Sequence, residues 1–284
     1  MDDRWLPGRV DDAVTDVDTP ALILDLDRFE GNLARLMSAV QGRGIRVRPH
    51  AKSHKCVEIA RRQMAAGAIG ICCQKTSEAE PFLAGGISDV LISNEVVGDR
   101  KTVQLARLAA SYPDARLGVC VDDPRAVAQL AHACELAHAR LDVYIELDVG
   151  HNRAGVTEGG GVVALGHAIA AQASLVLRGL HAYFGNAQHL RSIAERRQAI
   201  TTATATAQAA QSALIAAGLR CDVITGAGTG TFMLEAASGV YTEIQPGSYV
   251  MMDVDYAKNE PELTWPAFEQ SLMILTTVMS RRKD

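Results

Sequence analysis

The segment Arg-Pro-His-Ala-Lys-Ser-His-Lys at residues 48–55 gathers basic side chains and two histidines at the end of a short predicted strand. If the extended backbone continues, its period of two places Arg48, His50 and Lys52 on one face. Clustered positive charges repel one another, so such a group typically binds an anion or lowers the pKa of an amine. A lysine with a normal pKa near ~10.4 is almost wholly protonated at pH 7, whereas a lysine with a lowered pKa can form a Schiff base. Lys52 is therefore a candidate reactive amine, and the alternative is a solvated basic start of a helix.

A glycine-rich turn, Gly-Ala-Gly-Thr-Gly-Thr at residues 226–231, is the second candidate site. The backbone N–H groups of such a turn, and the N-terminus of a following helix, can bind a phosphate. No Gly-Lys-Ser/Thr closes the segment, so it is not a Walker loop, and tight turns also need glycine. A lysine amine together with a phosphate-binding turn indicates pyridoxal 5'-phosphate, with Lys52 carrying it as an imine.

The chain around these segments alternates predicted strands and helices. Short apolar runs predict eight strands, and alanine-rich or amphipathic stretches predict the helices between them. The predicted strands cover residues 21–25, 45–49, 69–73, 89–93, 116–121, 141–147, 176–183 and 221–225. Eight such units in roughly 240 residues match a (β/α)8 TIM barrel better than a doubly wound sheet.

Polar residues follow the ends of several predicted strands, where barrel enzymes carry their active sites. Besides residues 48–55 and 226–231, these polar segments are 74–75, 93–95, 148–153 and 183–189. Loops after strands seven and eight commonly bind phosphate in such barrels, which strengthens the case for the glycine-rich turn.

Composition limits the classes of protein that remain. With 284 residues and 48% hydrophobic content, the chain can bury a large core. The 28 basic against 33 acidic residues indicate no nucleic-acid partner. The first nine residues lack an apolar signal core, and no apolar run approaches the ~20 residues of a membrane span, so we expect a cytoplasmic protein without a membrane partner. Six cysteines form no C-x-x-C pair, and we expect buried thiols.

The alternation stops after Tyr256, and residues 272–278 read as an isolated apolar strand. Either this strand pairs with the N-terminal segment, or the chain is a fragment whose second domain is missing. We therefore expect a lead-in at 1–18, a barrel at 19–256 and the incomplete start of a C-terminal β domain at 257–284.

Together the motifs resemble the D-threonine aldolase and D-serine dehydratase-like family of fold-type III pyridoxal-phosphate enzymes, whose barrel is of the alanine racemase N-terminal type. Cys-Cys-Gln at 72–74 is most similar to the 3-hydroxy-D-aspartate aldolase and dehydratase branch. Besides residues 48–55 and 226–231, the matching segments are 19–25, 70–75, 148–155, 179–183, 188–189 and 245–253.

The resemblance implies roles for individual residues. Lys52 would carry the cofactor as a catalytic lysine, and His50 is a further catalytic candidate. The residues implied in cofactor binding, besides Lys52, are Arg153 and Tyr183 at the ring, Gly228, Thr229 and Gly230 at the phosphate, Tyr249 and Asp253 in the segment that closes the pocket, and Gln74. Core packing is the alternative for both tyrosines, and turn formation is the alternative for Asp253.

One feature of the family is missing from the sequence. Family members carry a His-x-Cys or His-x-Asp metal pair in a C-terminal β domain, and no histidine here follows His189. His132 and Cys134 have that spacing, but on a predicted helix neighbours two apart point about 200° around the axis. We therefore predict no metal ligand in this chain, although the full-length family uses a divalent metal.

The resemblance implies aldol cleavage of a β-hydroxy-D-amino acid to glycine and an aldehyde. D-Threonine would give acetaldehyde; 3-hydroxy-D-aspartate would give glyoxylate, with Arg48 or another basic group available to bind its second carboxylate. Dehydration, as in the D-3-hydroxyaspartate and D-serine dehydratases, and a truncated or non-catalytic cofactor-binding barrel are the alternatives. A homodimer is expected.

Overall fold

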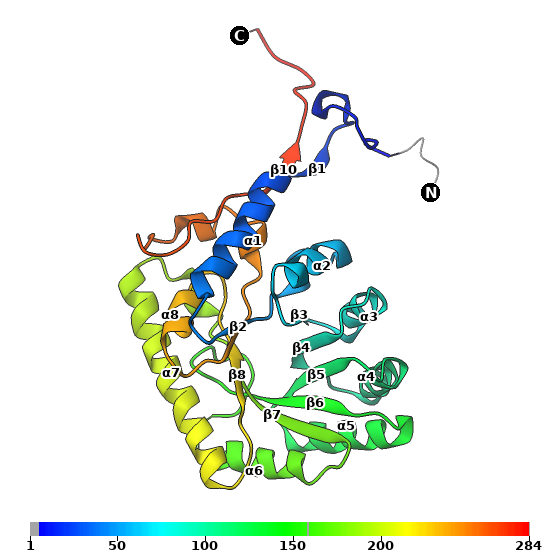
Figure 1. The fold of residues 1–284 in the computed structure, drawn as a ribbon, viewed down its shortest axis with the longest axis vertical. Coiled ribbons are helices and arrows are strands. Elements are labelled where there is room, and N and C mark those ends of the chain that lie inside the picture. Colours follow the sequence, from blue (N-terminus) through cyan, green and yellow to red (C-terminus); the bar gives the residue numbers. More distant parts are fainter. Residues whose placement is uncertain (1–5, 158, 284) are drawn as a thin grey trace.

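The computed structural model describes residues 6–157 and 159–283. Eight parallel strands, β2 to β9, form a barrel surrounded by helices, in the order β2-β9-β8-β7-β6-β5-β4-β3 (Figure 1). The barrel closes between its first two strands, where Ile69 N donates to Val47 O at 2.9 Å and Cys72 N donates to Pro49 O at 2.8 Å. The predicted (β/α)8 barrel is confirmed.

The barrel strands are short and mostly buried on both faces, as expected for parallel strands covered by helices. They are β2 (Arg46–Val47), β3 (Ile71–Cys73), β4 (Asp89–Glu95), β5 (Arg116–Val121), β6 (Leu141–Glu146), β7 (Leu175–Ala182), β8 (Val223–Gly226) and β9 (Glu243–Ile244).

The helices pack around the outside of these strands. They are α1 (Leu26–Val40), α2 (Val57–Ala65), α3 (Thr76–Ala84), α4 (Asp99–Ser111), α5 (Pro124–Ala137), α6 (Gly160–Ala170), α7 (Ile193–Ala216) and α8 (Phe232–Ala237). Within the described residues, the short 3-10 helices are η2 (Val14–Asp16), η3 (Ala51–Ser53), η4 (Asn186–His189), η5 (Ser248–Val250) and η6 (Tyr256–Lys258).

Several helices begin at a side chain that caps the first free N–H groups. Asp25 accepts from Arg28 N at the start of α1, Asp123 accepts from Arg125 N before α5, and Ser192 accepts from Ala194 N before α7. These short polar residues therefore fix where the barrel helices start.

The prediction that residues 21–25 form the first barrel strand is wrong. Strand β1 (Ala21–Leu24) pairs antiparallel with β10 (Leu272–Leu275), apart from the barrel. Leu22 is 70% exposed, which a buried parallel strand would not allow. An apolar run alone does not reveal whether a strand is covered on both faces.

The eighth barrel strand is β9 (Glu243–Ile244), which sequence reasoning missed. It contains only two residues, and one of them is a charged residue that is 1% exposed. A two-residue strand with a carboxylate carries no periodic signal, so the predicted number of strands was right while one member was not.

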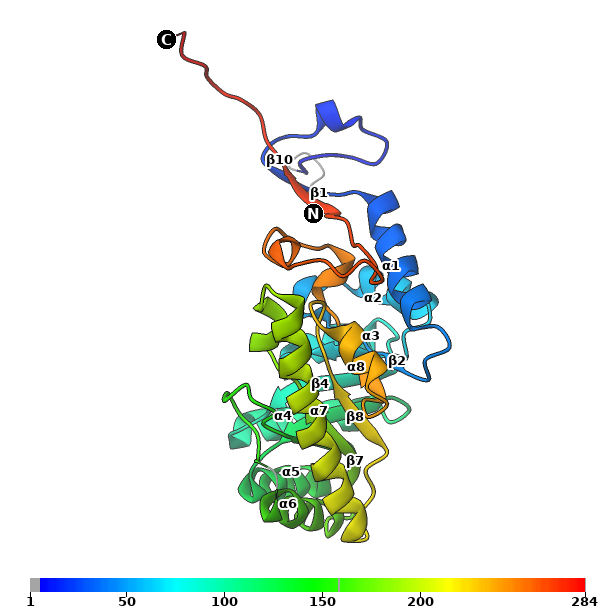
Figure 2. The same ribbon diagram turned by 90° about the vertical axis from the view of Figure 1, so that its left-hand side faces the viewer.

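The β1–β10 pair forms a ribbon that rises from the barrel beside α1 (Figure 2). Residues 272–275 of the predicted apolar strand pair with residues 21–24, and the predicted domain division stays a prediction. Ile274 is 67% exposed and Leu22 70%, so this ribbon presents apolar side chains to solvent.

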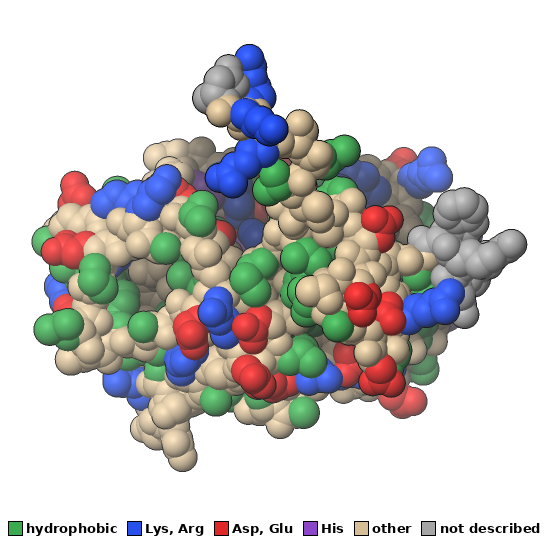
Figure 3. Space-filling view, turned by 90° about the horizontal axis from the view of Figure 1, so that it is seen from above, with side chains coloured by type: hydrophobic (Ala, Val, Ile, Leu, Met, Phe, Trp, Pro, Cys, Tyr) green, Lys and Arg blue, Asp and Glu red, His purple; other side chains and the backbone are tan. Residues whose placement is uncertain are grey.

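Apolar, acidic and basic side chains are interspersed on the face from which the ribbon rises (Figure 3). No helix in the described part of the chain is long and apolar enough to cross a lipid bilayer. All six cysteines are free thiols, and five of them are buried; Cys56 is half-buried.

Candidate active site

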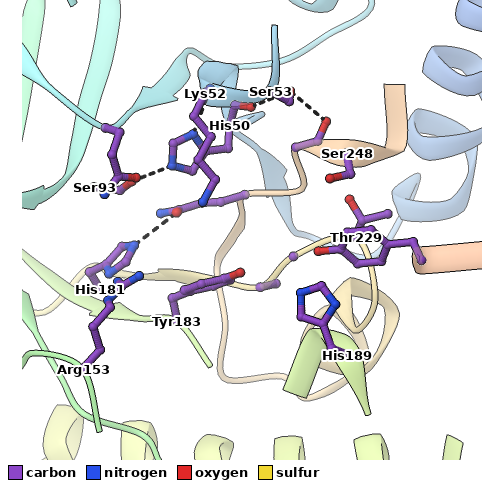
Figure 4. Close-up of a pocket in the computed structure, with 16 residues that line it drawn as sticks. His50, Lys52, Ser53, Ser93, Arg153, His181, Tyr183, His189, Thr229 and Ser248 are labelled. Carbon is purple, nitrogen blue, oxygen red and sulfur yellow. Dashed lines mark hydrogen bonds between the residues drawn. The ribbon is translucent and has the colours of Figure 1, made fainter. Parts of the chain in front are cut away.

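A cavity of about 290 Å³ opens at the C-terminal ends of the barrel strands, a small volume for a small-molecule site. Its walls come from loops that follow several strands, so residues far apart in the sequence meet there (Figure 4). Of the residues predicted for the site, those that line it are His50, Lys52, Gln74, Arg153, Tyr183, Gly228 and Thr229.

Lys52 lies in η3, directly after β2, and its amine points into the cavity (Figure 4). Its Nζ atom lies 5.9 Å from the centroid of the Tyr183 ring. Burial of the amine, and next the charge of Arg153, lower the pKa of Lys52 below its ordinary value of 10.5. A larger fraction of neutral amine is the property that imine chemistry requires.

His50 supports the turn that carries Lys52. Its Nδ1 atom accepts the backbone N–H of Lys52 at 3.3 Å, and its Nε2 atom lies 2.9 Å from the hydroxyl of Ser93. Burial, followed by the charge of Lys52, lowers the pKa of His50 well below 6.5. Both ring nitrogens are engaged, so the geometry suits a positioning role; the predicted catalytic role stays a prediction.

Arg153 and Tyr183 approach each other across the cavity. The guanidinium carbon of Arg153 lies 5.9 Å from the Tyr183 ring centroid, the same distance as the Lys52 amine. Arg153 also lies 3.6 Å from the carboxylate of Glu146, at the end of β6. The tyrosine ring is therefore bordered by two cationic side chains.

The glycine-rich turn follows β8, as predicted, and Gly228 and Thr229 line the cavity. A Cβ atom at Gly228 would lie 2.5 Å from Gln188 Oε1, so this close approach requires glycine. Gly230 does not line the cavity, and its N–H donates to the same Gln188 oxygen at 3.0 Å. The next helix, α8, has only six residues and adds little dipole to the site.

Tyr249 does not line the cavity. Its side chain is 1% exposed in the apolar cluster around α1, and its hydroxyl accepts a hydrogen bond from Gln63 Nε2 at 3.2 Å. Only its backbone N–H reaches the site, donating to Thr229 Oγ1 at 3.0 Å. The side chain does not line the cavity because it packs in the core, and the predicted role of Tyr249 in cofactor binding stays a prediction.

Asp253 also lies outside the cavity lining and forms a turn. Its Oδ1 atom accepts from Asp255 N at 2.9 Å and Tyr256 N at 2.8 Å, which starts η6. The segment does close the cavity, but through other residues, Gly247, Ser248 and Tyr256.

Arg48 does not face the cavity, contrary to the prediction of one face shared with His50 and Lys52. Its side chain is 2% exposed inside the barrel, with Nε 2.8 Å from Glu243 and Nη1 2.6 Å from Asp89. Strand β2 ends at Val47 and the chain then turns into η3, so the strand period does not extend to residue 52. With both carboxylates engaged, Arg48 cannot bind a substrate carboxylate.

Sequence reasoning assigned no role to His181, which lines the cavity, or to its neighbour Glu146. His181 Nδ1 lies 2.5 Å from Glu146 Oε2, and both side chains are buried. The available signal was Glu146, a carboxylate near the end of the mostly apolar segment 141–147. A buried charge there is costly without a partner.

His189 and Asp255 form a pair at the rim. His189 Nδ1 lies 2.7 Å from Asp255 Oδ2, and its ring lies 5.3 Å from that of Tyr256. Arg191 also contacts Asp255, at 2.6 Å, and holds the carboxylate in place. The rings of His189 and Tyr256 both belong to residues that line the cavity.

Two sets of side chains in the described residues bear on metal binding. His132 is exposed while Cys134 is buried, so these two helix neighbours point apart as predicted. One group of three possible donors occurs in the described ranges, Cys120, Glu146 and His181, with donor atoms within 4.8 Å of one another.

The fold and the cavity together define a (β/α)8 barrel whose site centres on one lysine at the carboxyl ends of the strands. The model of the "Alanine racemase, N-terminal domain" family matches residues 24–255. The chain is 46% identical to a D-threonine aldolase from an Arthrobacter species, over 97% of this chain and 72% of that protein.

Two further comparisons agree. The chain is 40% identical to a 3-hydroxy-D-aspartate aldolase from Paracoccus denitrificans, over 98% of this chain and 72% of that protein. The crystal structure of D-threonine aldolase from Filomicrobium marinum superposes with a TM-score of 0.93 at 48% identity, covering 97% of this chain and 73% of that one. The chain therefore belongs to the alanine racemase N-terminal domain family and, within it, to the D-threonine aldolase and 3-hydroxy-D-aspartate aldolase group, which confirms the resemblance.

Proposed function

We propose that the protein catalyses pyridoxal 5'-phosphate-dependent aldol cleavage of a β-hydroxy-D-amino acid, giving glycine and an aldehyde. The observation that carries the proposal is the Lys52 amine, whose lowered pKa suits imine formation, in one cavity with the turn at Gly228 and Thr229. The named activities of the aligned relatives, D-threonine aldolase and 3-hydroxy-D-aspartate aldolase, support it.

The residues of the cavity fit this cofactor. Lys52 would hold its aldehyde carbon, Tyr183 and Arg153 would contact its ring, and Gly228 with Thr229 would hold its phosphate. When bound, pyridoxal phosphate supplies an electron sink for the carbanion that remains after the Cα–Cβ bond breaks.

Cleavage also needs a group that accepts the proton of the β-hydroxyl. We assign this task to His189, because Asp255 orients its ring from Nδ1 and leaves Nε2 as a possible acceptor. His50 has no such free nitrogen, since Lys52 N–H and Ser93 occupy both positions. His50 instead keeps the lysine turn in place.

The substrate class follows from the cationic side chains that remain available. Arg48 was the expected partner of a second carboxylate, and its ion pairs inside the barrel remove that argument for 3-hydroxy-D-aspartate. D-Threonine has a single carboxylate and does not need this second partner.

Dehydration is a second candidate, because the chain is also 31% identical to a D-threo-3-hydroxyaspartate dehydratase from a Delftia species. Dehydration removes the Cα proton and the β-hydroxyl, whereas aldol cleavage breaks the carbon–carbon bond. The two reactions are therefore distinguished by their products.

The test supplies the cofactor-loaded chain with D-threonine or 3-hydroxy-D-aspartate, with and without a divalent metal, and identifies the products. Glycine with acetaldehyde or glyoxylate supports aldol cleavage, while ammonia with an oxo acid supports dehydration and overturns the aldolase assignment. L-Threonine is the matched control and should remain unreacted. If the protein consumes neither D-substrate, both assignments are overturned.

We further propose that the protein acts as a cytoplasmic homodimer. The exposed apolar side chains of the β1–β10 ribbon, among them Leu22 and Ile274, support an association surface. In this proposal residues 257–284 begin a β domain, to which β1 contributes through its pairing with β10. Light scattering after size-exclusion chromatography would test the dimer, and a monomer at micromolar concentration would contradict it.

A further inference from the structure

A chain of polar side chains crosses the barrel interior, and its hydrogen bonds fix where each proton lies. Arg48 can only donate, and its Nε–H donates to Glu243 Oε1 at 2.8 Å. Thr225 Oγ1 lies 2.8 Å from the same carboxylate oxygen, so the threonine hydroxyl donates to it. Thr225 Oγ1 then accepts from Gln245 Nε2 at 2.8 Å. The amide of Gln245 therefore turns its carbonyl oxygen toward His181.

This amide orientation determines one proton on His181. The Nε2 atom of His181 lies 3.1 Å from Gln245 Oε1, which has no proton to give, so Nε2 must carry a hydrogen. The other ring nitrogen, Nδ1, lies 2.5 Å from Glu146 Oε2. Arg153 approaches the second oxygen of Glu146 at 3.6 Å. The close approach of Nδ1 to a carboxylate oxygen favours a proton on this nitrogen as well, which would give the ring two protons.

Other titratable groups around His181 act in both directions. Glu146 on β6 and Glu95 at the end of β4 favour the charged ring, while Arg153 opposes it. Burial by itself would lower the pKa of His181, but the charge of Glu146 and the hydrogen bonds to Glu146 and Gln245 raise it above 6.5. The arrangement thus favours an imidazolium in a fully buried position.

His50, on the same cavity, has the opposite state. Its Nδ1 atom accepts the N–H of Lys52, so that nitrogen carries no proton and the ring is neutral. Its Nε2–H then donates to Ser93 Oγ at 2.9 Å. The cavity wall therefore holds one neutral and one charged histidine, and the neighbours of each ring favour its state.

We propose that Glu146 and Gln245 are positioning residues that hold His181 as an imidazolium, so that the cavity presents a permanent positive charge to an acidic oxygen of its ligand. Within the proposed function this ligand is the pyridoxal phosphate. The charged ring would lower the pKa of an acidic oxygen bound beside it. Only this last consequence rests on the proposed function, because the protonation of His181 belongs to the protein itself.

A metal ion held by Cys120, Glu146 and His181 is the competing interpretation of the same cluster. It requires a lone pair on His181, but Nδ1 faces a carboxylate and Nε2 faces the Gln245 carbonyl oxygen. Burial, followed by the charge of Glu146, raises the pKa of the Cys120 thiol well above its ordinary value, which disfavours a thiolate ligand. The hydrogen bonds account for the cluster without a cation.

The decisive experiment uses the chain without cofactor, labelled with ¹⁵N-histidine, and follows the ring nitrogens of His181 by NMR from pH 5.5 to 8.5. The His181→Asn variant assigns the signals. We expect imidazolium shifts for both nitrogens at pH 7 in the wild type. A neutral ring at pH 7 in the folded wild type would overturn the proposal, whether or not the protein cleaves any amino acid.

Variants test the assigned partners. Glu146→Gln should lower the midpoint of the His181 titration by about one pH unit or more, because it removes the charge with little change in size. Asp142→Asn is the matched control: this residue lies on the same strand, where it pairs with Arg116 and Arg178, and the His181 midpoint should not move. Equal midpoints in Glu146→Gln and wild type would overturn the assigned role of Glu146.

Two further readouts separate the alternatives. Cobalt(II) added to the cofactor-free chain should give no thiolate-to-metal absorption, and a band that Cys120→Ala removes would overturn the hydrogen-bonded interpretation. With pyridoxal phosphate bound, the pH midpoint of its absorption should rise in Glu146→Gln and not in Asp142→Asn. An unchanged midpoint in Glu146→Gln would show that the charged ring of His181 does not lower the pKa of the bound ligand.

Discussion

Arg48 and Glu243 form an ion pair inside the barrel, with 2.8 Å between Nε and Oε1 and both side chains at most 2% exposed. Asp89 adds a second carboxylate at 2.6 Å from Nη1. Strands β2, β4 and β9 are thus joined by one guanidinium in addition to their backbone hydrogen bonds. This arrangement assigns Arg48 to the structure of the barrel and not to the substrate.

Replacing Arg48 by methionine should lower the free energy of unfolding by about 3–5 kcal/mol, because it leaves two carboxylates without their buried partner. Urea unfolding followed by circular dichroism measures this loss. Arg125→Met is the control, since that residue is exposed on α5 and pairs only with Asp123. A loss no larger than that of the control would show that the ion pair does not support the barrel.

Arg48 also shows which features could be predicted from the sequence and which could not. Apolar periodicity predicted the barrel because each strand and helix is a local feature. Lys52, Tyr183 and Thr229 were found because they follow strand ends, where all parallel strands of a barrel converge. Glu243, the partner of Arg48, lies 195 positions away in the sequence. The direction of the Arg48 side chain depends on where β2 ends, and no local sequence pattern predicts that end.

The contact between Glu146 and His181 was equally hard to predict from the sequence. Glu146 and His181 could be noted as polar residues in apolar segments, but their distance depends on the register of β6 and β7, which pairs these two residues. Tyr249 is a different case, since neighbouring residues of its segment line the cavity while its own side chain packs in the core. Motifs therefore place backbone segments more reliably than side-chain directions.

Lys52→Ala should abolish the absorption of bound pyridoxal phosphate as an imine and reduce turnover by at least ~10³-fold, because no other amine takes its place. Absorption spectra and product formation measure the two effects. Lys55→Ala is the matched control, since Lys55 is 61% exposed and forms an ion pair with Glu78 at 3.1 Å. Retention of the absorption band in Lys52→Ala would assign the cofactor to another lysine.

Glu235 should make the stability of the protein depend on pH. Burial raises the pKa of this carboxyl from 4.5 to about 7, and its Oε2 atom has no hydrogen-bond partner among the described residues. The unfolded chain releases this proton near 4.5, so between these values the folded state binds more protons. The free energy of unfolding should therefore fall as pH rises from about 4.5 to 7, by on the order of 3 kcal/mol.

Urea unfolding of wild type and Glu235→Gln at pH 5 and pH 8 tests this sign. The glutamine variant cannot ionise, so its stability relative to the wild type should increase with pH. Glu135→Gln, an exposed position on α5, should follow the wild type at both pH values. The same pH dependence in wild type and Glu235→Gln would exclude Glu235 as its source.

His189→Asn should lower kcat by about 10²–10⁴-fold while pyridoxal phosphate stays bound, because the variant lacks the proton acceptor for the β-hydroxyl. Asn keeps a polar group of similar reach beside Asp255, so the rim should retain its shape. Steady-state kinetics with D-threonine, together with the absorption of the bound cofactor, separate loss of proton transfer from loss of binding. His132→Asn, exposed on α5, is the control and should behave as the wild type. Unchanged kcat in His189→Asn would mean that another group of the cavity accepts the proton. A loss of cofactor absorption as large as the loss of kcat would make His189 a cofactor-binding residue instead.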